Sequence, residues 1–440
     1  MSTLAVLGGP QIAPQGVDET RWPVVEPADV QAVTDTLLSG QLSWMNDTRV
    51  PALERQWADY VGADHCLAVN SGTAALHAAV AAAGVGPGDE VLVPALSFLA
   101  SASCVLHHQG VPVFVDVDPR TFTIDPTQLA QHLTDRTKAI IAVHLHGLPA
   151  DMDPIRQFAR QHDLVVIEDA AQAHAATYNG KRTGSLGDLA AFSIMAGKNL
   201  ATAGEGGLLT TSSADLRNRA DAVKMFGETV GADGHRDYNA HTMGWNYRLS
   251  GVVAAFTSTQ IERLDGYTAQ VQEGARALTK ALADVPGVVP PYVPDDRTHV
   301  YHHFRVLLDG SVAGLPDGVF RQAVHDSLLA EGIPVGEYQT RPLPGQTLFQ
   351  QRIGYGGGCP WTCGKSTRSY RQEDYPATLQ VIRSSLVVGK RLCMASFRDP
   401  DSVERYRDAF TKVLSNIDEL REYASTIDYV EPWQRESRLW

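Results

Sequence analysis

The sequence is poor in cysteine, in basic charge and in long apolar runs, and each shortage excludes a class of protein. Five scattered cysteines in 440 residues do not make a disulfide framework. Lys and Arg total 37 against 50 Asp and Glu, so the net charge of −13 gives no footprint for nonspecific binding to nucleic acid or to an anionic membrane.

The sequence also lacks the signals of export and membrane insertion. No basic residue precedes Arg21, and no continuous apolar core of signal-peptide type follows the first residues. The most apolar region, residues 66–86, is rich in Ala and Gly and is interrupted by polar side chains, so it does not predict a membrane span. We therefore expect a cytoplasmic protein.

What is present is ordinary globular material. Hydrophobic residues make up 44% and charged residues 20% of the chain, enough to bury a sizeable core. At about 150 residues per domain, this length allows two or three domains.

The first half of the chain alternates between helical and extended patterns. Between residues 28 and 62, two runs with helical spacing each close on a glycine, which predicts two helices. Beyond them, short apolar runs alternate with helix-like segments, and this rhythm predicts an α/β fold whose mostly parallel sheet is covered on both faces. The expected strands are 66–69, 90–94, 111–116, 139–144, 164–168, 190–194 and 208–211, and the expected helices between them are 74–84, 99–109 and 154–162.

The pattern changes after about residue 255. A long helical stretch over 252–282 leads into a Pro-rich segment, followed by a small α+β pattern and a helical tail over 403–423. An apparent insertion near 340–375 interrupts that pattern. We expect a large domain over 1–255 and a smaller C-terminal domain over 256–440.

A carboxylate stands where one buried strand ends. The segment LVVIEDAAQAH puts Asp169 at the carboxyl end of a parallel strand, which is where open α/β sheets bind their ligands. Asp is also a favoured N-cap before Ala-Ala-Gln, so this segment alone fits a helix cap equally well.

A lysine lies in an unusual loop one strand further on. Lys198 follows the strand that ends at Ser193 and precedes the glycine-rich return GEGG. A lone loop lysine is ordinarily a solvated charge. One that faces the ligand edge can lose hydration, lower its pKa and become a nucleophile or Schiff-base former.

The third element is a strand that runs directly into a helix through Ser71, Gly72 and Thr73. Free backbone N–H groups and the helix dipole make such a junction a phosphate site, although an ordinary capped helix fits this segment as well. Taken together, a phosphate cradle, a strand-end carboxylate and a loop lysine are what pyridoxal phosphate requires.

These segments resemble the DegT/DnrJ/EryC1/StrS family of pyridoxal-phosphate aminotransferases, which have fold type I and act on sugars, cyclitols and related cyclic ketones. The resemblance runs over about residues 25 to 265 and is carried by NSGTAALHAAVAAAGVGPGDEVLVP, VPVFVDVDPRTFTID, RTKAIIAVHLHGLPADMDPI, VVIEDAAQAH, FSIMAGKNL, GEGG and GWNYRLS. It implies a large domain with a central, mostly parallel sheet and a smaller α+β C-terminal domain.

The resemblance also implies a role for each matching residue. Lys198 corresponds to the Schiff-base lysine and Asp169 to the partner of the pyridine nitrogen, the two catalytic positions. The cofactor-binding positions add Gln172 at the phenolic oxygen, Phe98 stacked on the ring, Gly72, Thr73 and Ser193 at the phosphate, and Asn246, which family dimers supply from the neighbouring subunit.

The sequence departs from the family pattern where substrate would bind. Residues 194–197 replace a bulkier stretch before the lysine, His146 stands where Tyr is common, and YQTRPLP with the insertion replaces a Tyr-x-x-Pro-Leu-His pattern. Cys359 and Cys363 in the insertion are two thiols without a partnering His or Cys pair, which is poor zinc ligation, so we expect no metal. We expect the Gly-rich run of the insertion to form a mobile loop over the active site.

The resemblance implies a ping-pong aminotransferase that passes through pyridoxamine phosphate. The expected donor is L-glutamate or L-glutamine, the expected acceptor is a ketone on a small cyclic polar molecule such as a natural-product precursor, and the expected working unit is a homodimer with shared active sites. A sugar dehydratase on this fold is disfavoured because those relatives replace the lysine with His. A non-catalytic regulator that binds the cofactor or a ligand is the alternative from another class.

Overall fold

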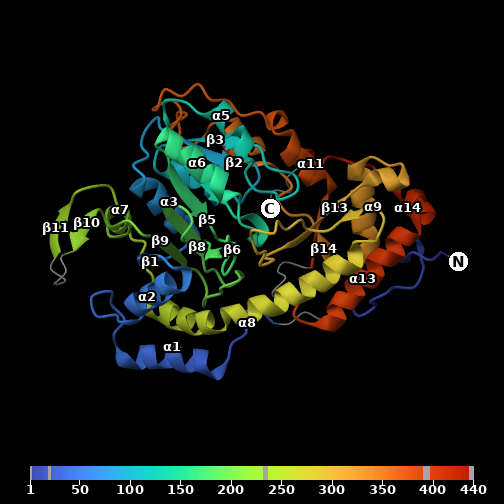
Figure 1. Ribbon diagram of the computed structural model, residues 1–440, viewed down its shortest axis with the longest axis horizontal. Coiled ribbons are helices and arrows are strands. Elements are labelled where there is room, and N and C mark those ends of the chain that lie inside the picture. Colours follow the sequence, from blue (N-terminus) through green and yellow to red (C-terminus); the bar gives the residue numbers. More distant parts are fainter. Residues whose placement is uncertain (1, 18–20, 231–235, 390–396, 436–440) are drawn as a thin grey trace.

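The computed structural model describes residues 2–17, 21–230, 236–389 and 397–435 (Figure 1). The first half builds a seven-stranded sheet in the order β1-β9-β8-β5-β4-β2-β3. Only β9 runs against its neighbours, so the sheet is mostly parallel, as expected. The strands are β1 His65–Val69, β2 Glu90–Pro94, β3 Val111–Val115, β4 Thr137–Val143, β5 Val165–Asp169, β8 Leu189–Ser193 and β9 Gly207–Thr211.

Helices cover both faces of this sheet because its strands are apolar on both sides. Val91 and Val93 of β2 pack in one hydrophobic cluster with α3 (Gly72–Ala82) and α4 (Ala100–His107). Leu92, between them, packs in another cluster with α6 (Met152–His162). The period-two alternation of a strand therefore buries neighbouring residues under different helices.

Two glycines end the first two long helices at the expected places. Helices α1 (Pro27–Ser39) and α2 (Arg49–Val61) stop at Gly40 and Gly62, whose φ angles of 69° and 79° lie in the left-handed region that glycine tolerates. Helix α2 packs beneath the sheet, whereas α1 lies outside it along α8 (Gly251–Leu282), as Figure 1 shows. One face of α1 is therefore left open to solvent.

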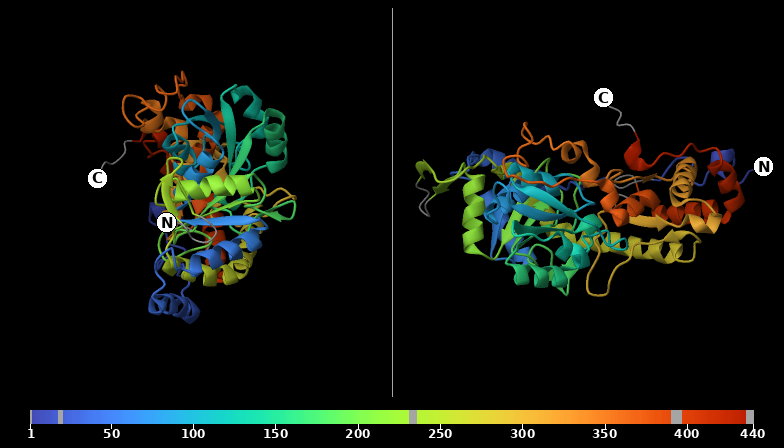
Figure 2. Two further views of the ribbon diagram at one scale, coloured as in Figure 1. Left: turned by 90° about the vertical axis from the view of Figure 1, so that its left-hand side faces the viewer. Right: turned by 90° about the horizontal axis from the view of Figure 1, so that it is seen from above.

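The second half contains a small antiparallel sheet in the order β12-β13-β15-β14. Helix α8 runs unbroken from beneath the large sheet to this region, and the two parts lie side by side along it (Figures 1 and 2). The elements are β12 Val288–Val289, β13 Phe304–Leu308, β14 Val335–Gly336, β15 Ser385–Val388, α9 Asp317–Ala330, α11 Pro376–Ser384, α13 Pro400–Ser415 and α14 Ile417–Ala424. No described helix is both long enough and apolar enough to cross a membrane.

Hydrophobic contacts cross the expected boundary at residue 255 in both directions. Leu4 and Ala13, at the start of the chain, pack in the core of the C-terminal part. Leu343, Phe349 and Trp361 pack instead in the cluster formed by α3 and α4. The division into 1–255 and 256–440 remains a prediction. Each of the two hydrophobic cores contains side chains from both segments.

Several short elements lay outside the sequence expectation. They include the hairpin strands β10 (Glu228–Val230) and β11 (Arg236–Ala240), the pair β6 (Thr177–Tyr178) and β7 (Lys181–Arg182), and the short helices α5 (Leu129–His132) and α10 (Thr347–Gln350), along with α7 (Ala214–Lys224). Most are too short for a periodic signal to emerge.

The insertion does not lie over the cavity described below, so the expectation of a loop above the site of its own chain is wrong. Its Trp361 is fully buried and donates through Nε1 to the Tyr370 hydroxyl at 2.8 Å. Tyr370 in turn donates to the carbonyl of Pro112, beside the start of β3. These contacts fix the insertion at the amino ends of the parallel strands, opposite the edge where ligands bind.

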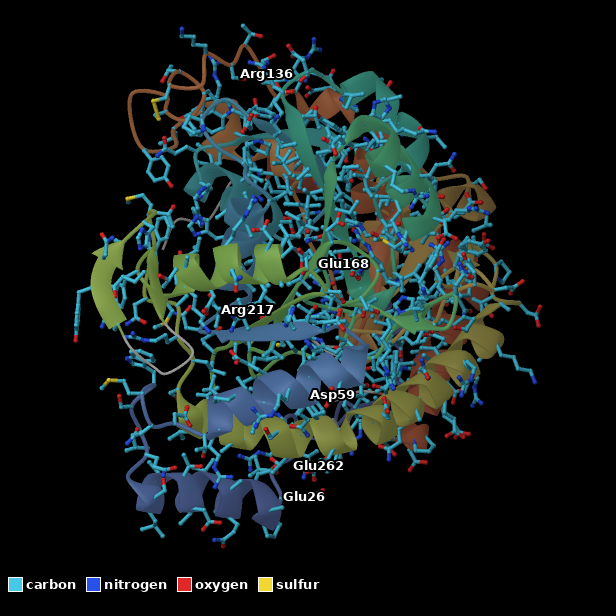
Figure 3. The ribbon with its side chains drawn as sticks, turned by 60° about the vertical axis from the view of Figure 1, so that its left-hand side comes forward. Glu26, Asp59, Arg136, Glu168, Arg217 and Glu262 are labelled. Carbon is cyan, nitrogen blue, oxygen red and sulfur yellow. A yellow bond between two sulfur atoms is a disulfide. The ribbon has the colours of Figure 1, made fainter. Side chains whose placement is uncertain are left out.

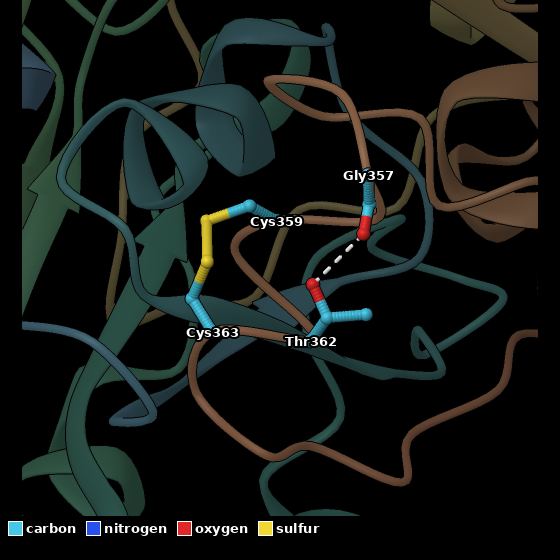
Figure 4. The surroundings of a disulfide bond; sticks show 4 residues. All are labelled: Gly357, Cys359, Thr362 and Cys363. Atoms are coloured by element: carbon cyan, nitrogen blue, oxygen red, sulfur yellow. Dashed lines mark hydrogen bonds between the residues drawn. A yellow bond between two sulfur atoms is a disulfide. The ribbon is translucent and has the colours of Figure 1, made fainter.

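The two cysteines of the insertion pair with each other. Figure 4 shows the disulfide between Cys359 and Cys363, with Thr362 donating to the carbonyl of Gly357 within the same loop. The expectation of scattered cysteines without disulfides is therefore wrong for this pair, which the sequence offered only as poor metal ligands. A separation of four residues in a glycine-rich loop instead lets the two sulfur atoms meet.

Candidate active site

A cavity of about 790 Å³ opens at the carboxyl ends of the parallel strands. Loops that follow β1, β2, β5 and β8 supply its walls, as the rule for open α/β sheets predicts. Of the eight residues predicted for the site, seven line this one cavity: Gly72, Thr73, Phe98, Asp169, Gln172, Ser193 and Lys198.

The two carboxylates that end β5 point in different directions. Glu168 is fully buried in the interior of the molecule, as Figure 3 shows. It accepts hydrogen bonds from His144 Nε2 at 2.9 Å and from the backbone N–H groups of residues 184, 186 and 187. His144 Nδ1 accepts from Ala150 N–H, so Nε2 carries the hydrogen that Glu168 receives. The hydrogen bonds of Glu168 therefore stabilise the fold, and of the two carboxylates only Asp169 faces the cavity.

Two serines hold the Asp169 carboxylate. Ser101 donates its hydroxyl to Asp169 Oδ2 at 2.6 Å, and Ser97 lies 2.6 Å from Ser101. The N–H of Ala171 donates to Oδ1 at 3.2 Å. A carboxylate has about four acceptor positions, so these bonds orient Asp169 and leave room for a donor from within the cavity.

Gln172 is fixed by a backbone donor. The N–H of His146 donates to Gln172 Oε1 at 2.7 Å, and this assigns the two ends of the amide because an N–H can only donate. The Nε2 group therefore donates one hydrogen to the Tyr338 hydroxyl at 2.9 Å and keeps a second for a ligand. His146 adopts a φ of 61°, the left-handed conformation that aims its N–H at the amide.

Lys198 lies on a turn at the cavity wall. Its backbone N–H bonds to the carbonyl of Met195, and its own carbonyl accepts from the Trp22 indole at 2.9 Å. Burial lowers the pKa of the Lys198 amine, while the charges of Asp169 and Glu205 oppose that shift. A lowered pKa enlarges the neutral fraction of the amine, the form that acts as nucleophile or base.

The start of α3 forms a cradle with free donors. Ser71 caps the helix by accepting from Ala74 N–H, and the N–H groups of Gly72 and Thr73 have no partner among the described residues. A Cβ on Gly72 would lie 2.6 Å from that of Ser193, and a Cβ on Gly207 would lie 2.2 Å from the Ser71 carbonyl. The glycines thus let β8 and β9 pass close enough to bring Ser193 to the helix terminus.

Phe98 is 64% exposed, although it lies inside the cavity. A large aromatic side chain is normally buried, so this exposure marks an apolar face with no covering protein atoms. A flat ring bound in the cavity would cover it.

Asn246, the eighth predicted residue, does not line the cavity of its own chain. Its side chain is exposed, with a 3.4 Å contact from Arg248 N–H, and its carbonyl accepts from Asn70. The structure therefore leaves its predicted role toward a neighbouring subunit untested.

Sequence reasoning missed several residues of the cavity wall. Trp22, His302, His303 and Tyr338 come from segments far from the sheet motifs in sequence. No local pattern marks them, since tertiary packing alone brings them to the strand ends. Tyr338 belongs to the segment YQTRPLP, where the departure from the family pattern was the one available signal.

These residues fit pyridoxal phosphate on chemical grounds. The two free N–H donors at the α3 terminus and the Ser193 hydroxyl suit a phosphate, the exposed Phe98 suits a ring, and the Asp169 carboxylate suits a protonated ring nitrogen. Lys198, buried with a lowered pKa in the same cavity, suits an aldehyde.

Comparison with known proteins identifies a family of aminotransferases. The model of the DegT/DnrJ/EryC1/StrS aminotransferase family matches residues 23–370. The chain is 38% identical over 392 residues to the spore coat polysaccharide biosynthesis protein SpsC of Bacillus subtilis, covering 88% of this chain and 95% of that one. It is also 38% identical over 323 residues to the L-glutamine:scyllo-inosose aminotransferase of Streptomyces griseus, covering 71% and 75% of the two chains.

Among solved structures, the chain is similar to the aminotransferase from Psychrobacter cryohalolentis. The TM-score is 0.78 at 30% sequence identity, and the match covers 91% of this chain and 100% of that chain. The similarity thus includes the C-terminal part as well as the large sheet.

Proposed function

We propose that this chain, which belongs to the DegT/DnrJ/EryC1/StrS aminotransferase family, takes the amino group from L-glutamine or L-glutamate. It is a pyridoxal-phosphate-dependent enzyme that acts on sugar-like ketones. We propose as acceptor a ketone on a small cyclic polar molecule, a sugar or a cyclitol. One observation carries the proposal: Lys198 and Asp169 face the same cavity as the free donors of the α3 terminus. The relative named for L-glutamine and scyllo-inosose supports this donor and this class of acceptor.

The wall residues divide the work of holding the cofactor. When bound, pyridoxal phosphate supplies a ring that withdraws electrons from the carbon that loses its proton. Asp169 would hold a proton on the ring nitrogen, and Gln172 would donate its second amide hydrogen to the phenolic oxygen. Phe98 would pack on the ring face, and the donors around Gly72, Thr73 and Ser193 would bind the phosphate.

Lys198 moves the proton of the reaction. With the cofactor bound, Lys198 would hold its aldehyde group through Nζ and would be released when an amino donor binds. The released neutral amine would then take the proton from the α-carbon of the donor as a base and return it as an acid. The same amine would serve both half-reactions.

The experiment that tests this function separates the two half-reactions. Holoenzyme mixed with L-glutamine or L-glutamate alone should change the absorption of its bound cofactor, and a later addition of scyllo-inosose or a nucleotide-linked keto sugar should restore it. A spectrum that no amino donor changes would contradict the proposal and favour the non-catalytic regulator. A donor response without any restoring cyclic ketone would overturn the assigned acceptor class.

We further propose that the working unit is a homodimer in which Asn246 reaches the phosphate of the neighbouring subunit. Asn246 is exposed and outside its own cavity, although its segment borders β1 through the bridge between Val69 and Arg248. Hydrophobic side chains that a partner would cover are exposed on α1, on the loop after it and around β11: Leu37, Leu38, Leu42, Met45, Tyr238 and Met243.

A mixing experiment tests the shared site. The Lys198→Ala chain and a chain with an inactivating Asn246 substitution are each inactive alone, and mixed dimers should regain one intact site and partial activity. Subunit exchange is verified separately with tagged chains. If the subunits exchange and no activity returns, Asn246 acts within its own subunit and the shared-site model is wrong.

A further inference from the structure

A buried arginine without a counter-charge stands behind one wall of the cavity. Arg305 on β13 is 3% exposed, and its guanidinium meets neutral partners: Nε donates to Ser385 Oγ at 2.8 Å and Nη1 donates to His146 Nε2 at 3.1 Å. Among the described residues, none offers a carboxylate within ion-pair distance, and the guanidinium carbon lies 5.3 Å from the centre of the uncharged Phe122 ring.

The imidazole beside it does not share the charge. Burial and the neighbouring guanidinium hold the pKa of His146 well below its usual range, so the ring is neutral and accepts from Arg305. Burial lowers the pKa of Arg305 to about 10, which leaves it protonated at neutral pH. A lone buried cation is costly unless a negative group approaches it.

The wall in front of Arg305 offers a hydrogen-bond donor. Tyr338 lines the cavity, and its oxygen already accepts from Gln172 Nε2, so its hydroxyl hydrogen is left to donate. The ring of His303, also in the wall, lies 4.4 Å from that of Tyr338, and the ring of His146 lies 5.4 Å from the Tyr338 ring and 5.5 Å from the His303 ring. A positive charge and a free donor therefore meet at the end of the cavity next to Gln172.

We propose that this end of the cavity is a carboxylate subsite, in which Tyr338 donates to the α-carboxylate of the amino donor and Arg305 supplies the counter-charge. This inference deepens the proposed function and rests on it. A carboxylate is common to glutamine and glutamate, whereas a cyclitol ketone has none. The subsite thereby holds the donor amino acid and gives no extra affinity to a neutral acceptor.

Equilibrium binding of unreactive ligands to the holoenzyme tests the subsite. Glutaramate is glutamine without its amino group, and glutaramide replaces its carboxylate by an amide. Titration calorimetry should show that wild type prefers glutaramate and that Arg305→Gln and Tyr338→Phe weaken its binding by about 10- to 100-fold, the range for hydrogen bonds to charged groups. Binding of glutaramide should not change, and Arg305→Lys should retain most of the affinity because it keeps the charge.

Three results would overturn the assignment: no preference for glutaramate in wild type, unchanged glutaramate binding in Arg305→Gln, or equal weakening of both ligands, which would mark Arg305 as structural. A loss confined to 3-oxocyclohexanecarboxylate, a carboxylated ring ketone, would instead assign the subsite to the acceptor. Arg120→Gln, at a largely exposed arginine paired with Asp118, serves as the control for loss of positive charge. Because glutaramate and glutaramide have neither an amino group to give nor a ketone to accept one, the subsite can be confirmed or refuted even if the holoenzyme transfers no amino group.

Discussion

Replacing Asp169 by Asn tests whether this carboxylate acts on a cofactor or merely caps a turn. The substitution preserves shape, and the local hydrogen bonds can be remade: the amide oxygen accepts from Ala171 N–H, and the amide nitrogen donates to Ser101, whose hydroxyl turns toward Ser97. We therefore expect the free energy of unfolding to change by about 1 kcal/mol or less.

The catalytic loss should be much larger. An amide cannot hold a proton on the ring nitrogen, so a preorganised charge in the enclosed cavity is lost. Removing one such electrostatic interaction costs about 2.7–4 kcal/mol in the barrier, or a factor of about 10² to 10³ in rate. The rate constant of the donor half-reaction, followed by stopped-flow absorbance with saturating L-glutamine or L-glutamate, should fall by this factor while the cofactor stays bound.

The neighbouring carboxylate provides a matched control. Glu168→Gln puts an amide nitrogen against backbone N–H donors in a fully buried position, so we expect a loss of about 1–3 kcal/mol in the free energy of unfolding. Its donor half-reaction should stay near the wild-type rate below the new melting temperature. Near-normal rates in Asp169→Asn, or equal stability losses in the two variants, would refute the division of roles.

Three further predictions address the lysine, the buried histidines and the insertion. Borohydride should fix the cofactor to the peptide that contains Lys198, and Lys198→Ala should bind cofactor without turnover; label on another lysine would contradict its role. Burial lowers the pKa of His174, His299 and His303 to about 3. As pH falls below about 6.5, the unfolded chain therefore binds protons that the folded chain does not, and urea titrations should show stability lost at up to about 1.4 kcal/mol per pH unit for each histidine. Constant stability from pH 7 to 5 would contradict this burial. Trp361→Ala should lower the free energy of unfolding by about 3–5 kcal/mol. It should leave the rate of the donor half-reaction unchanged, because the contacts of Trp361 lie at the opposite end of the strands. A slower half-reaction in a stable variant would place the insertion at the active site.

The large sheet could be predicted from the sequence because its signals are local. A parallel strand buried on both faces is a continuous apolar run, and the expected strands 90–94 and 208–211 differ from β2 and β9 by at most one residue at either end. Glycines that end helices carry their own conformational reason, as Gly40 and Gly62 do. The motif residues followed from the same logic, since strands that end at one edge bring their following loops together.

The second wall of the cavity could not be predicted in this way. Tyr338 and His303 reach the cavity because the C-terminal part folds against the strand ends along α8, and no periodicity in either segment encodes that docking. The insertion was misplaced for the opposite reason: its glycine-rich composition suggested a free loop, whereas one tryptophan anchors it in a distant core. A single large apolar side chain can outweigh the composition of a whole loop, because burying it contributes more free energy than ordering a few glycines costs.

The residues proposed to bind the cofactor and those proposed to bind the substrate therefore reach the site by different routes. Asp169 ends a strand of the large sheet, and Lys198 and the α3 terminus follow directly after other strands of that sheet. Arg305 and Tyr338 belong to the C-terminal part, where His146, a departure from the family pattern, accepts from Arg305. A substitution at residue 146 thus changes the surroundings of a charge on β13 and leaves the lysine and its carboxylate in place, so the cavity can exchange one substrate for another without rebuilding the chemistry.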